Sequence, residues 1–193
     1  PRTGLPEYFD SHGEYLRHIE VLVNAGVIED ATKIWWDIRP SEHYPTLELR
    51  VPDVCTLLED ALAVAAFYRC WLRMLYRLRR DNQRWRRYSN FLINENRWRA
   101  HRYGIDEGLL DVGRGEIVPY KDLIDEAVDL IDKDALHFDC IDEINHLYTI
   151  IEKGTSAHRQ LETFSNALKS GMNQEEAVRL VVDQLIDETL IGT

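Results

Sequence analysis

Two short runs of alternating apolar and polar residues, joined by a proline-rich turn, constrain the fold of this chain more than any other feature. They lie within residues 35–53, whose sequence is WWDIRPSEHYPTLELRVPD. Successive side chains of a β-strand point to opposite faces, so each run has one apolar face and one polar face. The intervening PSEHYP carries two prolines and is typical of a connecting turn. The sequence therefore predicts an antiparallel β-hairpin with one buried face.

The polar face of this predicted hairpin collects two carboxylates and two guanidinium groups. Asp37 and Arg39 lie on the first run, and Glu48 and Arg50 lie on the second. Carboxylate oxygens bind divalent cations and arginine forks bind phosphate, which suits chemistry on a nucleoside triphosphate. The same pattern is expected for a solvated strand face whose opposite charges pair across the ladder, at about 0.2–1 kcal/mol per pair. The spacing alone leaves both interpretations open.

Length and composition predict a single unit spanning residues 1–193. A chain of 193 residues with 45% hydrophobic residues can bury one ordinary core. Its three cysteines show no CxxC spacing, which argues against a disulfide framework and a zinc site. No run approaches the roughly 18 apolar residues that a membrane span needs, and the first residues carry no signal-peptide pattern. We therefore expect a soluble, cytoplasmic protein with reduced thiols.

Capping signals mark the first helices. Ser11–Glu14 is a capping-box pattern that opens an amphipathic helix ending near Gly26. Thr56–Glu59 is a second one, from which a helix free of Gly and Pro runs over 56–80. The residues expected to face inward from the first helix are Tyr15, Leu16, Ile19, Leu22 and Val23.

The remainder of the chain is predicted to be mainly helical. Residues 90–104 indicate a short helix ending at Gly104, and Gly113–Gly115 favours a second β-hairpin. A helical region over 120–191 follows, with helices at about 121–132, 135–152, 157–169 and 175–190. These patterns predict an α+β chain that is predominantly helical. A lone hairpin is marginal by itself, so we expect neighbouring strands from another chain or from a further part of the polypeptide.

Charge is strongly segregated along the chain. Residues 1–68 sum to −7, residues 69–102 to +9 and residues 103–193 to −13. The middle block interleaves arginine with aromatic residues, as a single-stranded nucleic-acid groove does. The acidic remainder would repel a phosphate backbone, so we expect no nucleic-acid partner and no membrane partner. Two explanations of the arginine-rich block remain. The acidic helices neutralise it, or it binds a small phosphate ligand.

Four blocks in a fixed order carry a resemblance to a known family. They are WDIRPS at 36–41 with TLELRVPD at 46–53, NRWRAHRYG at 96–104, and GTSAHRQL at 154–161. Their order and spacing resemble the C-terminal half of the glutamate-cysteine ligase type 2 family of ATP-dependent carboxylate-amine ligases. The resemblance covers essentially the whole chain, and four ordered blocks are far more specific than one motif.

This resemblance implies a fold, a reaction and cofactors. The fold is like that of glutamine synthetase, in which a curved antiparallel β-saddle carries packed helices and binds its ligands on the concave face. The reaction is ATP-dependent phosphorylation of the carboxylate of glutamate or a similar amino acid, followed by attack of an amine such as cysteine on the acyl phosphate. ATP and Mg2+ are the implied cofactors, and small amino acids are the implied substrates.

The resemblance also implies roles for the hairpin residues. Glu48 matches the family's sheet glutamate and would bind magnesium, while Arg50 would contact the transferring phosphate. Arg39 would bind a phosphate or the substrate carboxylate. For Asp37 a further metal ligand and a simple partner of Arg39 are equally compatible with the sequence.

Further candidates for ATP or substrate binding lie outside the hairpin. Asn96, Arg97 and Arg102 match the family pattern of a nucleotide or substrate contact, although packing against acidic helices explains them as well. Thr155 and Ser156 lie where a helix begins, so backbone N–H groups there could bind an anion. Simple N-capping accounts for these two residues equally well.

The chain departs from the family in length. Family members are about twice as long, and their N-terminal half supplies a strand with its own glutamates and further metal ligands. A cation takes about six oxygen ligands, which Glu48 and Asp37 cannot supply. We therefore expect a fragment or one piece of a split enzyme whose partner is the missing N-terminal half, with a homo-oligomer contact as a further option. The alternative function is a non-catalytic helical binding module derived from the same fold.

Overall fold

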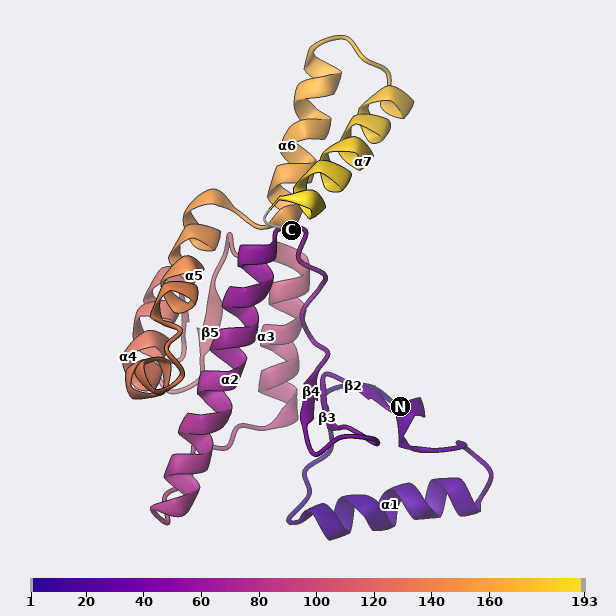
Figure 1. Cartoon of the computed structure of the whole chain (residues 1–193), viewed down its shortest axis with the longest axis vertical. Helices are drawn as coiled ribbons and strands as arrows, with labels where there is room; N and C mark the ends of the chain where they lie inside the picture. Colours follow the sequence, from indigo (N-terminus) through magenta and orange to yellow (C-terminus); the bar gives the residue numbers. More distant parts are fainter. Residues whose placement is uncertain (1, 192–193) are drawn as a thin grey trace. The chain divides into compact units, whose positions relative to one another are not determined.

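The computed structural model describes residues 2–191 and divides the chain into two compact units, Pro1–Asp53 and Val54–Thr193. Length and composition predict a single unit over residues 1–193, and the division lies within it. Figure 1 shows the order of the elements along the chain. The mostly helical α+β character predicted from the sequence is confirmed.

The first unit combines one long helix with very short strands. Strand β1 (Thr3–Gly4) pairs in parallel with β2 (Trp35–Trp36), and β3 (Ile38–Pro40) pairs antiparallel with β4 (Leu47–Leu49). Helix α1 spans His12–Asn24, and a 3-10 turn, η1, spans Ala31–Lys33. Each sheet of this unit has two strands. The described residues therefore contain the predicted hairpin, while a larger saddle-shaped sheet is not seen in them.

Helix α1 confirms the first predicted cap but buries fewer residues than expected. The Glu14 amide donates to Ser11 Oγ at 3.1 Å, but the Glu14 carboxylate accepts from the Asp10 amide at 2.7 Å, so Ser11 caps the helix without the reciprocal bond of a capping box. Tyr15 and Ile19 are buried against η1, whereas Leu16 and Val23 are 43% and 36% exposed. The prediction that these last two residues face inward is wrong, because η1 and the short strands cover only a narrow stripe of the helix.

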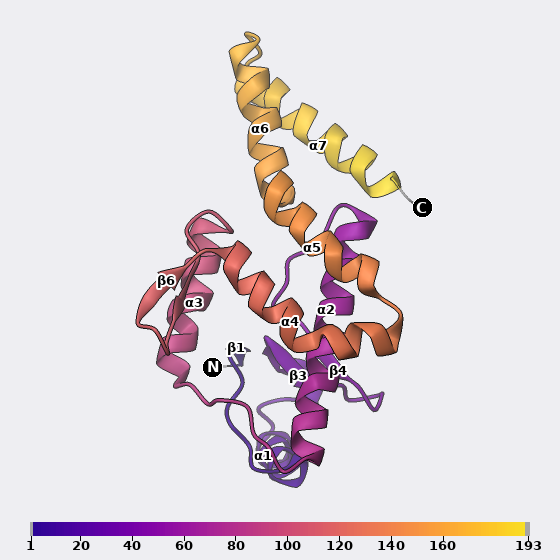
Figure 2. The same cartoon turned by 90° about the vertical axis from the view of Figure 1, so that its left-hand side faces the viewer.

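The second unit is built from six helices and one hairpin among its described residues. Its core lies where α2, α4 and α5 meet, around side chains such as Cys70, Met74, Ile131 and Ile144. Helices α6 and α7 pack on each other and extend away from this core (Figure 2). The elements are α2 (Leu58–Arg80), α3 (Asn90–Tyr103), β5 (Leu109–Asp111), β6 (Glu116–Val118), α4 (Tyr120–Phe138), α5 (Ile141–Lys153), α6 (Ser156–Lys169) and α7 (Gln174–Leu190).

Two predicted boundaries in this unit are wrong. Helix α4 continues to Phe138, past the expected break near residue 133, and Asp139 ends it with a left-handed φ of 51°. No Gly or Pro interrupts the helix at residue 133, so backbone hydrogen bonding continues there. Helix α2 starts at Leu58, and the hydroxyl of Thr56 bonds to Glu188 instead of capping the helix. Among the helices of the described part of the chain, none combines the length and apolar character needed to cross a bilayer.

Candidate functional site

The hairpin register brings the four predicted charged residues onto one face. Arg39 lies directly opposite Glu48 in the ladder between β3 and β4. The Arg50 amide donates to the Asp37 carbonyl at 2.8 Å, which places these two residues opposite each other one step further along. Since side chains alternate along a strand, residues two apart share a face. The structure thus groups Asp37, Arg39, Glu48 and Arg50 within the first unit.

Arg39 is the buried anchor of this face. Its side chain is 9% exposed, and Nε donates to Glu48 Oε2 at 2.9 Å. Its Nη1 donates to three backbone carbonyls of the η1 turn, those of Ala31, Thr32 and Ile34. The guanidinium therefore ties the hairpin to η1 and holds the Glu48 carboxylate in place.

Glu48 and Arg50 form the accessible part of the face. Arg50 Nη1 lies 3.5 Å from Glu48 Oε2, and the two side chains are 37% and 32% exposed. Burial pushes the pKa of Glu48 upward, but the hydrogen bond and charge of Arg39, with Ser41 and Arg50, hold it below its usual range. Glu48 is therefore a carboxylate at neutral pH, flanked by an accessible guanidinium.

Asp37 is more deeply placed than Glu48. The residue is 9% exposed, and its backbone amide donates to the Gly4 carbonyl at 2.7 Å. Its backbone thus joins β1 to the hairpin. Within the described residues 2–191 no group of three or more His, Cys, Asp or Glu side chains is arranged to hold a metal ion. Glu48 and Asp37 do not by themselves make a magnesium site.

Tyr15 is a residue that the sequence analysis treated only as core. It is 5% exposed, yet no described residue hydrogen bonds to its hydroxyl group. Burial is the largest cause that raises the pKa of this hydroxyl. The negative charges of Glu42 and Glu48 also raise the pKa, and the positive charge of Arg39 lowers it. A buried hydroxyl without a partner is uncommon in proteins. The sequence does not reveal this feature, because Tyr15 has the same helical spacing as the apolar residues that form the buried face of α1.

The predicted residues Thr155 and Ser156 lie in a hydrogen-bonded corner of the second unit. The Thr155 amide donates to His158 Nδ1 at 3.1 Å, so Nε2 carries the imidazole proton and bonds to Asp106 Oδ1 at 3.1 Å. Ser156 Oγ lies 3.1 Å from Thr56 Oγ1. Thr155 therefore caps α6 together with His158, whereas the Ser156 hydroxyl bonds to Thr56.

Arg159 centres a polar cluster that the sequence analysis did not single out. It lies in the GTSAHRQL block and contacts both oxygens of Glu188, from Nε at 3.0 Å and from Nη2 at 3.2 Å. Nη2 also lies 3.5 Å from Asp60 Oδ2, whose other oxygen lies 2.8 Å from His146 Nε2. Asp60 and Glu188 are 7% and 8% exposed. The cluster joins α2, α5, α6 and α7, which are distant in sequence.

The remaining predicted binding residues lie on α3. The Asn96 side chain bonds to the Leu110 backbone in both directions, donating to its carbonyl at 2.9 Å and accepting from its amide at 2.7 Å. Arg102 lies 5.8 Å from the ring centre of Tyr103. Arg97 is half-buried on the same helix. These residues belong to the second unit, whereas the hairpin belongs to the first.

The arginine-rich block is partly neutralised inside the second unit. Asp134 is fully buried and accepts from Arg77 Nη2 at 2.6 Å and from Arg73 Nη1. Burial raises the pKa of this carboxyl, but the hydrogen bonds from Arg77 and Arg73 outweigh it and hold the pKa below its usual range. The acidic helix α4 therefore neutralises two of the arginines of α2, as one of the sequence-based explanations predicts.

Comparison with known proteins identifies the class to which this fold and these residues belong, a family of ligases. The model of glutamate-cysteine ligase family 2 matches residues 1–184. The chain belongs to this family, as the four sequence blocks predict.

Three relatives illustrate the similarity, and each carries the printed name "Putative glutamate--cysteine ligase 2". The protein of Rhodospirillum rubrum is 62% identical over 190 residues, covering 98% of this chain and 49% of the relative. That of Jannaschia sp. is 47% identical, covering 97% of this chain and 50% of the relative. That of Sorangium cellulosum is 39% identical, covering 100% of this chain and 49% of the relative. The chain thus spans about half the length of these relatives.

Proposed function

We propose that this chain supplies part of the active site of an ATP-dependent ligase that joins an amino-acid carboxylate, that of glutamate or a similar compound, to the amine of cysteine or a similar compound. Membership of the family supports the ligase class, and the geometry of Arg39, Glu48 and Arg50 supports the place of the site. The shared face of β3 and β4 is the observation on which the assignment rests. The three free cysteines support the cytoplasmic location.

The proposed reaction has two steps. An oxygen of the substrate carboxylate attacks the γ-phosphorus of ATP, ADP leaves, and an acyl phosphate forms. The amine nitrogen then attacks the acyl carbon, its proton is lost, and inorganic phosphate leaves with the amide formed. Phosphoryl transfer depends mainly on positioning and charge stabilisation.

Within this scheme each hairpin residue has a distinct task. Arg50 has the accessible guanidinium and stabilises charge on the transferring phosphoryl group. Arg39, whose Nε and Nη1 donors contact Glu48 and backbone carbonyls, acts as a positioning residue for Glu48. Glu48 presents a carboxylate kept charged at neutral pH.

ATP and Mg2+ remain the proposed cofactors of the complete enzyme. The residues of this chain do not complete a magnesium site, so no step is assigned to the ion here. The relatives' additional length supports a second segment of polypeptide that contributes further ligands. Asn96, Arg97, Arg102, Thr155 and Ser156 stay candidates for ATP or substrate contacts, of which Asn96 is engaged with Leu110.

The test combines this chain with the remaining segment of the ligase polypeptide and measures phosphate release that depends on both amino acids. We expect Arg50→Gln to lower kcat by about 100-fold or more, as removal of one transition-state donor does, while Arg50→Lys retains part of the activity. Arg17→Gln, an exposed arginine of α1, is the matched control.

An isotope experiment tests the intermediate. Glutamate labelled with 18O in its side-chain carboxylate should pass one labelled oxygen to each phosphate released. Unlabelled phosphate would contradict the acyl phosphate, and full activity in Arg50→Gln would remove the site assignment. No turnover in the complete assembly, with no heat on titration with magnesium-ATP, would favour the non-catalytic binding module.

A further inference from the structure

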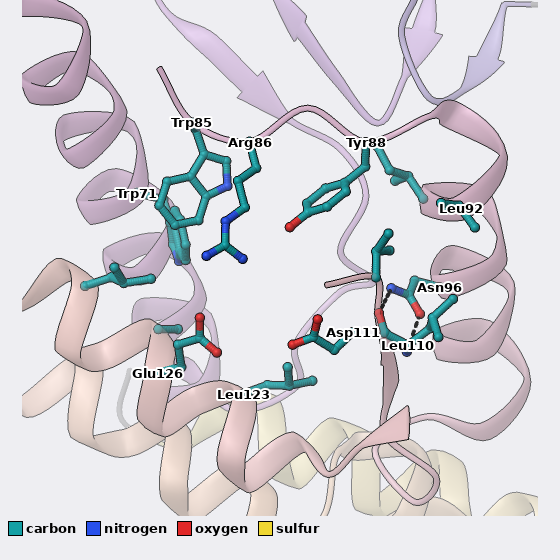
Figure 3. A pocket seen from close by; sticks show the side chains of 14 residues that line it. Trp71, Trp85, Arg86, Tyr88, Leu92, Asn96, Leu110, Asp111, Leu123 and Glu126 are labelled. Carbon is teal, nitrogen blue, oxygen red and sulfur yellow. Dashed lines mark hydrogen bonds between the residues drawn. The ribbon is translucent and has the colours of Figure 1, made fainter. Parts of the chain in front are cut away.

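The second unit contains an open cleft that Asp37, Arg39, Glu48 and Arg50 do not line, although the candidate residue Asn96 does. Its volume is about 270 Å³, and its walls come from α2, α3, α4, the β5–β6 hairpin and the loop after α2. Figure 3 shows the side chains that converge on it. The residues used below are Trp71, Trp85, Arg86, Tyr88, Asp111 and Glu126.

Opposite charges face each other across this cleft without a direct ion pair. Figure 3 shows Arg86 on one wall, with the carboxylates of Glu126 and Asp111 turned towards it from the other. Among the described residues no ion pair within 4.0 Å joins Arg86 to either carboxylate. Arg86 donates a hydrogen bond to the Tyr88 side chain, which is the largest cause that raises the pKa of Arg86, and the nearby acidic groups add to this shift, so the guanidinium stays charged.

The two carboxylates differ in what they already bind. Asp111 Oδ1 accepts from the Gly113 amide at 2.7 Å and from the Arg114 amide at 2.9 Å, which commits it to the hairpin turn. Glu126 accepts no hydrogen bond from a described residue. Glu126 is therefore the carboxylate that remains available to a ligand, and it faces Arg86, which donates one hydrogen bond to Tyr88.

The walls between these charges are apolar and aromatic. Trp71 and Trp85 pack edge to face, with ring centres 5.6 Å apart at 81°. Leu92, Leu123 and Leu130 complete the lining. The side chain of Asn96 bonds to the Leu110 backbone in both directions and so braces the wall. A ligand here buries an apolar group against indole and leucine side chains.

We propose that this cleft binds a free α-amino acid with an apolar side chain. The carboxylate of the ligand pairs with Arg86, its ammonium group pairs with Glu126, and its side chain packs on Trp71 and Trp85. A ligand that carries both charges pairs with Arg86 and with Glu126 at once. A phosphate would face two carboxylates, and an organic cation would leave the charge of Arg86 without an anionic partner. The site lies wholly within the second unit and does not depend on the hairpin chemistry.

L-Phenylalanine and two analogues that each lack one charge test this proposal. Phenethylamine lacks the carboxylate, and 3-phenylpropionate lacks the ammonium group. Binding to the intact chain is followed by calorimetry and by tryptophan fluorescence excited at about 295 nm, where phenylalanine does not absorb, with Trp71 and Trp85 as reporters. We expect saturable binding of L-phenylalanine, and at least tenfold weaker binding of each analogue.

Two charge variants should each affect a different set of these compounds. Glu126→Gln should weaken the binding of L-phenylalanine at least tenfold and leave the binding of 3-phenylpropionate unchanged. Arg86→Gln should weaken the binding of L-phenylalanine to a similar extent and leave the binding of phenethylamine unchanged. Asp122→Asn on the same helix and Arg84→Gln in the same loop are exposed controls and should bind like the original chain. Circular dichroism verifies that all variants keep their helix content.

Three results would overturn the proposal. One is the absence of saturable binding of L-phenylalanine. Another is equal affinity for all three compounds, which would mean that apolar contact alone drives binding. The third is equal weakening by the controls and the two charge variants. Because the assay needs neither ATP nor amide formation, such a failure would leave the proposed ligase function standing.

Discussion

The Arg39 guanidinium shows how burial assigns a role to a charged side chain. The sequence places it beside a phosphate or a carboxylate, and the structure shows it bonded to Glu48 and to the carbonyls of η1. Arg50, two positions beyond Glu48, keeps an accessible guanidinium. Two arginines on one strand face thus divide into an internal brace and a ligand-facing group.

Replacement of Arg39 should destabilise the first unit. We expect Arg39→Ala to lower the free energy of unfolding by on the order of 3 kcal/mol, because buried carbonyls and Glu48 lose a charged donor. Arg50→Ala, at an exposed pair, should change it by less than about 1 kcal/mol. Urea denaturation followed by Trp35 and Trp36 fluorescence measures both. Equal effects of the two variants would contradict the division of roles.

Removal of the Tyr15 hydroxyl should leave the unliganded chain at least as stable. Since no described residue bonds to this buried group, Tyr15→Phe removes only a desolvated hydroxyl, and we expect a change between zero and about 1 kcal/mol in the stabilising direction. Ile19→Ala on the same buried face should cost about 2–5 kcal/mol. A clear loss of stability in Tyr15→Phe would reveal a partner for the hydroxyl.

At the scale of elements, polar contacts attach the pair of helices α6 and α7 to α2. Thr56, which the sequence analysis assigns to a helix cap, bonds instead to Glu188 near the end of α7. Arg159 of α6 bonds to the same carboxylate. The long helices are thus joined at their ends by a charged cluster, while apolar packing dominates between α2, α4 and α5.

This cluster should weaken in acid. Burial raises the pKa of Glu188, but hydrogen bonds from Arg159, Thr56 and Gln184 outweigh it, so the folded-state pKa lies below its usual value of about 4.5. A lowered folded-state pKa contributes stability above the unfolded-state pKa, and this contribution is lost as pH falls below about 4.5. Unfolding measured from pH 7 to pH 3 should be less pH-dependent in Glu188→Gln than in the original chain.

The exposed pair of Glu175 and Arg179 provides the control for that experiment. Their side chains are 76% and 75% exposed, so Glu175→Gln should leave the acid dependence unchanged. A similar flattening in both variants would show that the Glu188 cluster is not the cause.

Helix α7 should respond differently on its two sides. Ala177 is fully buried against α6, whereas Val182 is 50% exposed. Ala177→Leu overfills the contact and should cost about 1–3 kcal/mol, while Val182→Ser should change stability by less than about 0.5 kcal/mol. Thermal unfolding monitored by circular dichroism compares the two. A larger effect at Val182 would contradict the packing of α7.

At the scale of the whole molecule, the chain comprises two compact units that meet in sequence at Asp53 and Val54. Val54 is 83% exposed, and no helix or strand covers residues 50–57. Unit boundaries of this kind are preferred sites of proteolysis. Elastase, which cleaves after small apolar residues, should therefore cut early at Val54 and release a helical fragment.

A matched variant tests this prediction. Val54→Lys should slow that cut, and mass spectrometry of the early fragments identifies the site. The released second unit should retain its helical circular dichroism spectrum, because its apolar core is formed from α2, α4 and α5 alone. Early cleavage within α2 would contradict the boundary.

The sequence by itself determined the local elements and the family. Periodicity and capping residues predicted the hairpin of Arg39 and Glu48 and the helices after Tyr120, since these depend on neighbours within a few positions. Only the tertiary structure decided which partner each polar group takes. Thr56 and Glu188 are 132 positions apart, and the unpartnered hydroxyl of Tyr15 follows from burial against η1. Such choices depend on desolvation and on distances between remote segments, which no local pattern encodes.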